Sequence, residues 1–269
     1  MVRAAASDRL SAICWGLAST SFSLFEMIRN FDDSQRTLDV AYALAAAVGD
    51  TLGEAVLLCR IGTLASDRND VRQALSHFSR SAEMFQQARS WHGLALAKVH
   101  MALAYRSLDQ TEHALSCLEE AVPALRECGD KGGEAFALRN LAQISIAAAD
   151  YTAADAYLAT ALTCARQGES RRREAQVLYY QGMLRLSQDQ SHDAERLFLD
   201  VLTLTTQLGD KAGQIQAHRG LSFCHERVGD RIRAEAALNT ALNLAHQPKP
   251  TLMETMVQDD LAALLGKSP

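Results

Sequence analysis

Small and large apolar residues recur along this chain with a period of 40 residues, and each period divides into two halves of 20. A small residue recurs in the first half, at Gly62, Ala102, Ala142, Gly182, Ser222 and Ala262. An alanine recurs in the second half, at Ala74, Ala114, Ala154, Ala194 and Ala234. A large apolar residue follows each alanine by four positions, at Phe78, Leu118, Leu158, Phe198 and Leu238. Residues four apart share one face of a helix, so each half predicts an amphipathic helix, and the small residues predict where two helices cross closely.

Residues that favour helix starts follow the same period. One series consists of Asp50, Ser90, Asp130, Ser170 and Asp210. A second series, offset by 20 residues, consists of Asn30, Asp70, Gln110, Asp150, Gln190 and Asp230. Asp, Asn and Ser side chains at such positions accept a hydrogen bond from an N–H group of the first helical turn. Each period is therefore predicted to contain two helices.

The predicted fold is an all-α solenoid of six antiparallel helix pairs in a single domain over residues 1–269. The pairs are expected at residues 8–48, 51–88, 91–128, 131–168, 171–208 and 211–247. Pro248 and Pro250 interrupt the pattern, and a closing helix at residues 252–266 is expected to cover the last pair.

Three features modify this regular pattern. Gly49, Gly129 and Gly209 precede N-caps and can end a helix in the left-handed conformation, whereas Arg89 and Glu169 fill the intervening places, so turns of two alternating kinds are expected. Phe22 replaces a small residue and Ser34 replaces an alanine, which leaves the register of the first pair open. Pro123 is expected to bend its helix near Glu119.

Composition agrees with a folded helical protein. Hydrophobic residues make up 48% of the 269 residues, charged residues 22%, and only four are proline. A net charge of −5 gives no general attraction to nucleic acid or anionic lipid. No apolar run approaches the ~20 residues of a membrane span, and the N-terminus lacks the hydrophobic core of a signal peptide. We therefore expect a cytoplasmic protein that contacts neither nucleic acid nor membrane directly.

Candidate chemistry is sparse. The sequence contains no P-loop, nucleophile elbow, HExxH, dinucleotide fingerprint or zinc-spaced Cys and His cluster, so we expect no catalytic residue, cofactor or metal site. His218 and His225 flank Cys224, but a third metal ligand at suitable spacing is missing, and packing histidines are the alternative. The run Arg171, Arg172 and Arg173 opposes the dipole of the helix that it opens, so it forms either a solvated turn or an anion contact.

The cysteines form no CxxC pair and lie within apolar helical patterns, which is typical of small buried thiols. They are Cys14, Cys59, Cys117, Cys128, Cys164 and Cys224.

The spacing of these residues resembles the tetratricopeptide repeat. Leu141, Ala142, Ala154, Leu158 and Ala161 match the family's pattern of small, large and alanine positions, in a longer form of about 40 residues instead of the usual 34. The likeness covers nearly the whole chain and implies a right-handed superhelix. Its Gly-Asp-x-x-Gly-Glu-Ala turns resemble those of kinesin light chains, spindle-orientation adaptors and bacterial regulators. The Ala-rich and Arg-rich character looks most like the bacterial group, which includes peptide-sensing regulators and the sensor regions of large transcription regulators.

The resemblance implies that the first helix of each pair lines a concave groove. Positions counted from the small residue place these residues in the predicted groove: Leu96, Val99, Leu103, Arg106, Phe136, Arg139, Gln143, Ile146, Gln176, Tyr179, Met183, Gln216, Arg219 and Phe223. Apolar side chains interleaved with arginines would hold an apolar segment and pair its carboxylates. Packing against a neighbouring helix is the alternative at each position.

These features favour a non-catalytic scaffold or sensor that binds a protein or peptide segment in its groove, with a role in bacterial regulation. Replacing Arg139 and Tyr179 together should then abolish partner binding and leave the helical content unchanged. Two alternatives stay open. A self-assembly module would place another copy's terminus in the groove. An enzyme or small-molecule-binding protein would instead enclose a cavity around titratable groups such as His100, Tyr179, Tyr180, His218, His225 and Glu226.

Overall fold

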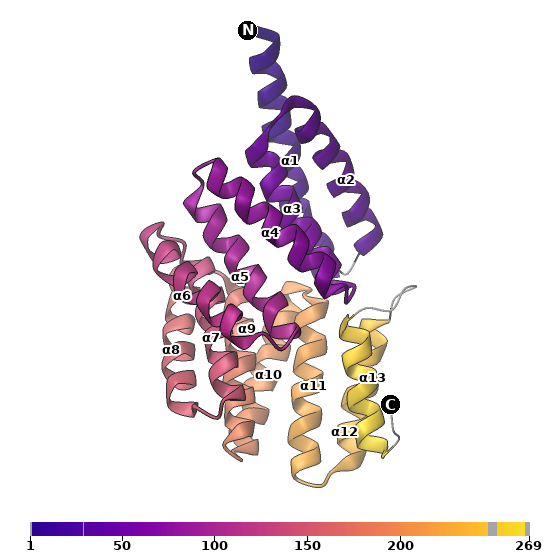
Figure 1. Cartoon of the computed structure of the whole chain (residues 1–269). Helices are drawn as coiled ribbons and strands as arrows, with labels where there is room; N and C mark the ends of the chain where they lie inside the picture. The colour runs from indigo at the N-terminus through magenta and orange to yellow at the C-terminus, as the bar shows by residue number, and fades with distance from the viewer. Residues whose placement is uncertain (1, 29, 247–251, 267–269) are drawn as a thin grey trace. The chain divides into compact units, whose positions relative to one another are not determined.

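Thirteen α-helices and no strand occupy the part of the chain that the computed structural model describes, residues 2–28, 30–246 and 252–266 (Figure 1). The first helices of the pairs are α1 (Val2–Ile28), α3 (Thr51–Asp67), α5 (Trp91–Ser107), α7 (Lys131–Ala147), α9 (Arg171–Ser187) and α11 (Lys211–Arg227). The second helices are α2 (Phe31–Val48), α4 (Val71–Gln87), α6 (Thr111–Glu127), α8 (Tyr151–Gln167), α10 (Ser191–Leu208) and α12 (Arg231–Ala245). The closing helix is α13 (Leu252–Leu265). The prediction of an all-α chain of six pairs and a closing helix is confirmed.

The helices form two compact units, Met1–Gly129 and Asp130–Pro269. Unit 1 contains α1 to α6, and unit 2 contains α7 to α13. The predicted continuity of a single solenoid through Gly129 and Asp130 remains a prediction, and each unit is described separately below.

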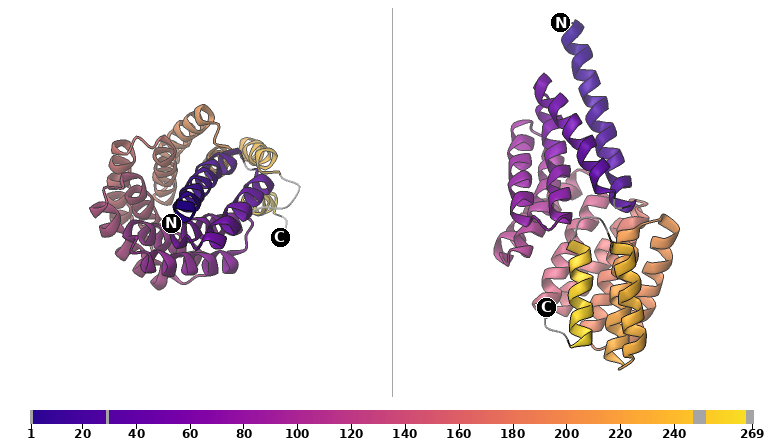
Figure 2. Two further views of the ribbon diagram at one scale, coloured as in Figure 1. Left: turned by 90° about the horizontal axis from the view of Figure 1, so that it is seen from above. Right: turned by 90° about the vertical axis from the view of Figure 1, so that its right-hand side faces the viewer.

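Both units stack their helices by the same rule. Each helix packs against its sequence neighbours, first within a pair and then from a second helix to the next first helix (Figure 2). First helices also contact one another, α1 with α3 and α3 with α5 in unit 1, and α7 with α9 and α9 with α11 in unit 2. No such contact joins successive second helices in the described residues. The first helices therefore lie together along one side of each unit.

Helices cross closely at the small residues that the sequence pattern predicted. A Cβ atom added to Gly62 would lie 2.6 Å from the ring of Phe78, and one added to Gly182 would lie 2.6 Å from the ring of Phe198. Phe198 also fills the space beside Gly220 of the next first helix, at 2.5 Å. Both phenylalanines are almost fully buried. The large apolar residue of the second helix thus fills the space between pairs, as predicted.

The predicted N-caps are confirmed at every Asp and Asn and at Ser170. Asp50, Asp130 and Asp210 accept hydrogen bonds of 2.8 to 3.1 Å from the backbone N–H three residues later. The cap bonds of Asn30, Asp70, Asp150, Ser170 and Asp230 follow the same rule. Ser90 makes no side-chain cap bond, so the prediction fails there, and Gln110 and Gln190 make none either.

The expected alternation of turn types is wrong. Gly49, Gly129 and Gly209 have positive φ, but Arg89 and Glu169 in the intervening places also do, at 55° and 51°. The same conformation recurs at Asn69, Asp109, Ala149 and Asp189. Because every turn must reverse the chain in the same short distance, the backbone adopts the left-handed region even where a Cβ atom opposes it.

The first pair joins the array despite its departures. Phe22 and Ser34 are both buried, with α1 packed on α2 and α3. The helix α1 begins at Val2, earlier than the predicted start at residue 8. It has 27 residues, yet neither it nor any other described helix is long and apolar enough to cross a membrane. The helix α6 continues through Pro123, whereas Pro248 and Pro250 lie outside the described residues.

Candidate functional site

The best-defined part of the predicted groove lies in unit 2. In this unit α7 contacts α9, and α9 contacts α11. These three helices carry most of the predicted groove residues. We call the surface that they share the first-helix face; its predicted members are Phe136, Arg139, Gln143, Ile146, Gln176, Tyr179, Met183, Gln216, Arg219 and Phe223.

The predicted members of the first-helix face differ in how deeply they are buried. Phe136, Arg139 and Tyr179 expose only 6 to 7% of their surface, and the other members of the first-helix face are half-buried. Half-buried side chains of mixed polarity are suited to contact a ligand while they remain anchored in the protein.

Arg139 is the centre of a stack of cationic and aromatic groups. Its guanidinium carbon lies 4.9 Å from the ring centroid of Phe136 and 5.0 Å from that of Tyr180. The guanidinium of Arg173 lies 4.0 Å from the same Phe136 ring. Because Arg139 and Phe136 come from α7 while Tyr180 and Arg173 come from α9, the stack joins two first helices.

Two residues of the arginine run, Arg172 and Arg173, make contacts within unit 2. Arg172 Nε donates to Asp210 at the start of α11, at 3.2 Å, and Arg173 stacks on Phe136 and donates to Gln176 at 2.9 Å. Arg171 remains exposed, at 3.4 Å from Gln207. Two of the three arginines are therefore bound within unit 2 and are not part of a solvated turn.

Tyr179 belongs to the core, which corrects the prediction that it lines the groove. Its ring packs in the cluster around Phe198, at 5.5 Å between centroids, and edge-on against Tyr180 at 5.2 Å. Burial raises the pKa of the Tyr179 hydroxyl, which therefore stays protonated. Its half-buried neighbour Tyr180 takes the position against Arg139.

Two residues of this face were missed by sequence reasoning. Tyr180 and Asn140 both lie two residues before the small residue of their helix, a phase that the prediction did not include. Asn140 exposes 2% of its surface and donates from Nδ2 to the carbonyl of Phe136 at 2.8 Å. In unit 1, Arg60 holds the same phase and lies over the Phe22 ring of the preceding first helix, at 5.5 Å. The repeat period therefore contained the signal, in a phase that faces the neighbouring first helix.

Arg219 is engaged by the closing helix. Its Nε donates to Asp260 on α13 at 2.5 Å, and its guanidinium lies 5.8 Å from the Phe223 ring. Burial disfavours the charge, but the hydrogen bond to Asp260 and the electrostatic attraction of Tyr179, Asp260 and Tyr180 together outweigh this effect and raise the pKa of Arg219. Arg219 therefore contributes to closing the array, because its charge is balanced within unit 2.

The remaining predicted groove residues lie on α5 in unit 1. Leu96, Leu103 and Arg106 are half-buried, whereas Val99 has no exposed surface and cannot line a groove. Val99 lies on α5, which packs against both α4 and α6.

Comparisons with known proteins decide the repeat class. A family model described as the SusR N-terminal TPR domain matches residues 56–179. The chain has the tetratricopeptide-repeat fold. A search of curated proteins finds no match to its sequence.

Solved structures share the fold of this tetratricopeptide-repeat protein. BtubC from P. vanneervenii has a TM-score of 0.58 and 22% identity, with 82% of this chain and 94% of that chain covered. NprR in complex with its cognate peptide NprX has a TM-score of 0.67 and 16% identity, with 94% and 71% covered. A Rap protein complexed with competence and sporulation factor has a TM-score of 0.67 and 14% identity, with 93% and 79% covered. At these identities the similarity establishes the fold.

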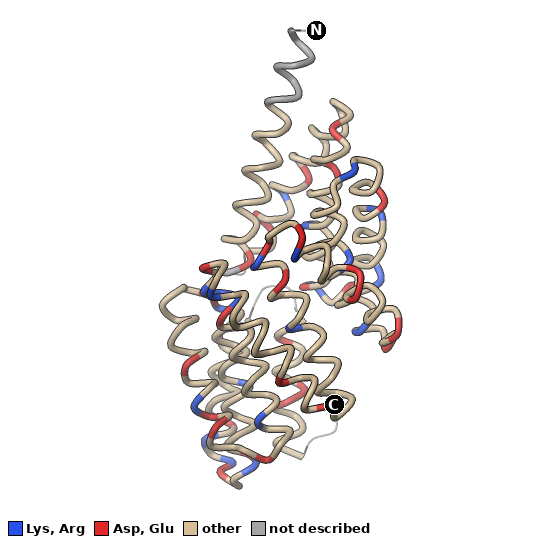
Figure 3. Tube along the Cα trace, turned by 90° about the vertical axis from the view of Figure 1, so that its left-hand side faces the viewer, with Lys and Arg blue, Asp and Glu red and all other residues tan. Residues whose placement is uncertain are grey.

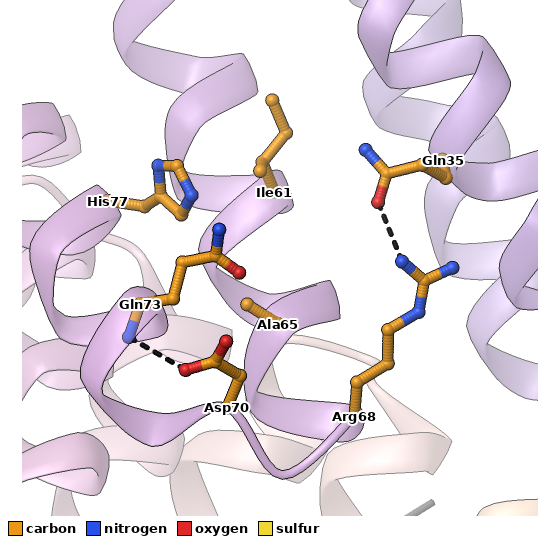
Figure 4. Close-up of a pocket in the computed structure, with 7 residues that line it drawn as sticks. All are labelled: Gln35, Ile61, Ala65, Arg68, Asp70, Gln73 and His77. Carbon is orange, nitrogen blue, oxygen red and sulfur yellow. Dashed lines mark hydrogen bonds between the residues drawn. The ribbon is translucent and has the colours of Figure 1, made fainter. Parts of the chain in front are cut away.

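A separate cavity lies in unit 1 of the tetratricopeptide-repeat protein. It has a volume of about 280 Å³ and is lined by Gln35, Ile61, Ala65, Arg68, Asp70, Gln73 and His77, which come from α2, α3, α4 and the α3–α4 turn (Figure 4). Arg68 donates to Gln35 at 2.9 Å, and Asp70 accepts from the backbone N–H of Gln73 at 3.1 Å. Burial lowers the pKa of His77, so its ring is neutral at neutral pH. None of the six titratable residues expected for an enzyme pocket lines this cavity.

The other candidate reactive groups are largely placed in the core. Burial raises the pKa of Cys59 to about 11 and that of Cys224 to about 12, so both are unreactive thiols. Cys128 is exposed, and Cys14 and Cys117 are half-buried, which corrects the prediction that all six cysteines are buried. The described residues contain no cluster of three or more His, Cys, Asp or Glu side chains that could hold a metal ion.

Proposed function

We propose that this tetratricopeptide-repeat protein is a regulatory scaffold that binds a peptide or a segment of a partner protein on the first-helix face of unit 2. The observation that carries the proposal is the stack of Arg139 between Phe136 and Tyr180, because it combines a fixed cation with aromatic surface at the junction of two first helices.

The chemistry of this face favours a ligand with both apolar and acidic groups. Its contacts with two rings hold the Arg139 guanidinium, and with it a positive charge, at the junction of α7 and α9. Because Arg139 is only 7% exposed, its positive charge is weakly screened by solvent and favours acidic groups in a ligand bound beside the stack. Half-buried Met183 and Phe223 supply apolar contact, and Gln143, Gln176 and Gln216 supply carboxamides that can bond a peptide backbone.

Solved structures of the same fold support the ligand class. NprR is described in complex with its cognate peptide, and a Rap protein in complex with competence and sporulation factor. Another similar structure is an apo form of the quorum sensor NprR from B. thuringiensis, with a TM-score of 0.55. By analogy of fold, we propose a role in bacterial regulation, carried out in the cytoplasm by recognition of a peptide.

The proposal is tested by selecting ligands for the full chain from a displayed library of random peptides. We expect enriched peptides to combine acidic and apolar residues. Arg139→Gln and Tyr180→Leu should each weaken binding of a selected peptide by about 10-fold, because the first removes the charge of the stack and the second removes its aromatic surface.

Arg196→Gln is the matched control, because Arg196 is an exposed arginine on the second helix α10. This variant should bind the peptide as the natural sequence does, and thermal melts should show that all the variants are folded. Failure to enrich any peptide, or equal affinity in the Arg139 and Tyr180 variants, contradicts the proposal.

A further inference from the structure

The cavity of unit 1 lies where one first helix carries an alanine and most later ones carry a long side chain. Buried Ala65 on α3 lines the cavity, and the residues 40, 120 and 160 positions later are Tyr105, Arg185 and His225. The remaining counterpart, Ser145, is also short. The cavity is therefore a place in the repeat that a side chain fills in most of the later pairs and that unit 1 leaves open.

The contacts of Arg185 in unit 2 show what such a side chain does. Its guanidinium donates to Asp155 on the preceding second helix at 3.0 Å and to Gln188 at 2.8 Å. These two partners hold the repeat positions of Gln35 and Arg68, which line the cavity of unit 1. The flat guanidinium thus occupies the equivalent place in unit 2.

The other two long counterparts also end in flat groups. Tyr105 stacks on His113 with ring centroids 5.2 Å apart, and His113 holds the repeat position of Gln73 in the cavity. His225 lies 3.9 Å from Glu195 of the preceding second helix. A phenol, a guanidinium and an imidazole are all planar and carry polar atoms at their edge. The repeat therefore favours a planar group with a polar edge as the occupant of the cavity.

In unit 1 a neighbouring residue makes the contact between helices and leaves the space open. Arg68 donates to Gln35 on α2 at 2.9 Å. In Figure 4, Arg68 and Gln35 lie on one side of the cavity, Gln73 and His77 lie on the opposite side, and Ile61 and Ala65 lie between them. The volume of about 280 Å³ is below the roughly 300–1,000 Å³ of ordinary ligand pockets, so it suits a single ring with a small substituent.

The charges around the cavity favour a neutral ligand. Arg68 on one side lies 3.6 Å from exposed Asp32, and on the other side the charges of Arg80 and Asp70 both act on His77. Two cations and two carboxylates thus balance, so either a cationic or an anionic ligand would meet a like charge. Figure 3 shows acidic and basic residues interspersed over unit 1, without an extended region of one sign.

The hydrogen-bonding groups call for a ligand that both accepts and donates. Asp70 accepts from the backbone N–H of Gln73 through Oδ1 at 3.1 Å, so its other carboxylate oxygen can accept from a ligand. Arg68 has five N–H donors, more than its bonds to Gln35 and to the carbonyl of Phe31 use. A carboxamide is planar and neutral, and it offers an oxygen acceptor beside two N–H donors.

We infer that the cavity of unit 1 binds a small, neutral aromatic carboxamide, with its C=O group toward Arg68 and its NH₂ group toward Asp70. The aromatic ring then lies on the apolar surface of Ile61 and Ala65. This site is separate from the first-helix face of unit 2 and takes a different ligand, so either proposal can fail without the other.

Titration of the isotope-labelled full chain with benzamide, followed by NMR, tests this inference. Benzamide should produce saturable shifts in the side-chain signals of Gln35, Gln73 and His77, with a dissociation constant in the millimolar range or below, as expected for so small a ligand. Benzoate and benzamidine have nearly the same shape and should bind at least about 10-fold more weakly, because each brings a charge beside a like charge.

Two variants locate the binding. Ala65→Tyr supplies the ring that Tyr105 supplies in the next pair, so it should fill the cavity and abolish the benzamide shifts. Arg68→Met adds no such ring and should weaken binding by about 10-fold, because it removes a charged hydrogen-bond donor. Ser145→Tyr is the matched control, since it makes the same change at the same repeat position of unit 2, and it should bind benzamide as the natural sequence does.

Thermal melts should show which variants are folded before their affinities are compared. The inference is overturned if benzamide causes no saturable shift at the cavity, or if benzoate or benzamidine binds there as tightly as benzamide. Unchanged benzamide affinity in a folded Ala65→Tyr variant, or in Arg68→Met, would overturn it as well.

Discussion

At the scale of single residues, the array depends on glycines that leave room for one phenylalanine. Phe198 is fully buried and lies against both Gly182 of its own pair and Gly220 of the next. One side chain of the second helix therefore sets the distance to two first helices. A side chain at either glycine would have to displace a ring that has no free space around it.

Gly182→Ala should accordingly lower the free energy of unfolding by about 1–3 kcal/mol, the usual cost of overpacking a core. Gly132→Ala is the matched control, because its Cβ atom would lie no closer than 3.5 Å to any neighbour. That variant should be neutral or up to about 1 kcal/mol more stable, since alanine favours a helix over glycine. Urea unfolding of both variants measures the difference, and equal stability would show that Phe198 adapts at little cost.

Residue-scale detail also marks the limit of the sequence-based prediction of the site. Arg139 and Phe136 were predicted from the repeat register and do meet, but Tyr179 was placed in the groove and lies in the core beside Phe198. Neighbouring positions on a helix differ by about 100° in direction, so an error of one position in the predicted phase turns the wrong tyrosine toward α7. The phase is set by packing between helices distant in sequence, which a periodic pattern does not specify.

At the scale of elements, helix starts were predictable and helix ends were not. The caps at Asp50, Asp130 and Asp210 follow from a local side-chain hydrogen bond, which the residue type specifies. The ends depend on a residue in the left-handed conformation. Glycine favours this conformation, but other residue types also adopt it here. Ala149 and Glu169 adopt this conformation because the N-cap of the next helix must follow one residue later in every turn.

Ala149→Gly should therefore raise the free energy of unfolding by about 1 kcal/mol, because it removes the steric cost of a Cβ atom at φ 57°. Ala148→Gly at the adjacent position should instead lower it by up to about 1 kcal/mol, since Ala148 has a negative φ of −82° and gains nothing from glycine. Thermal unfolding of the two variants compares them directly. A loss of stability in Ala149→Gly would contradict the strain assigned to these turns.

At the scale of the whole molecule, the period of 40 residues organises both units by one rule, in which first helices meet first helices. The fold was predictable because each pair repeats the same local solution of cap, small residue and large apolar residue. The contact with the closing helix could not be inferred from that repetition. Arg219 is bound by Asp260 on α13, so a residue of the last pair has a partner outside the repeats.

The account as a whole places ligand binding on the first helices α7, α9 and α11. Hydrogen exchange of the full chain, with and without a peptide selected from the displayed library, tests this placement most directly, because binding slows the exchange of the backbone it covers. The account predicts slower exchange in α7, α9 and α11, lost in Arg139→Gln and retained in Arg196→Gln. Protection confined to the second helices α8, α10 and α12, or to the cavity of unit 1 around Arg68 and His77, would contradict it.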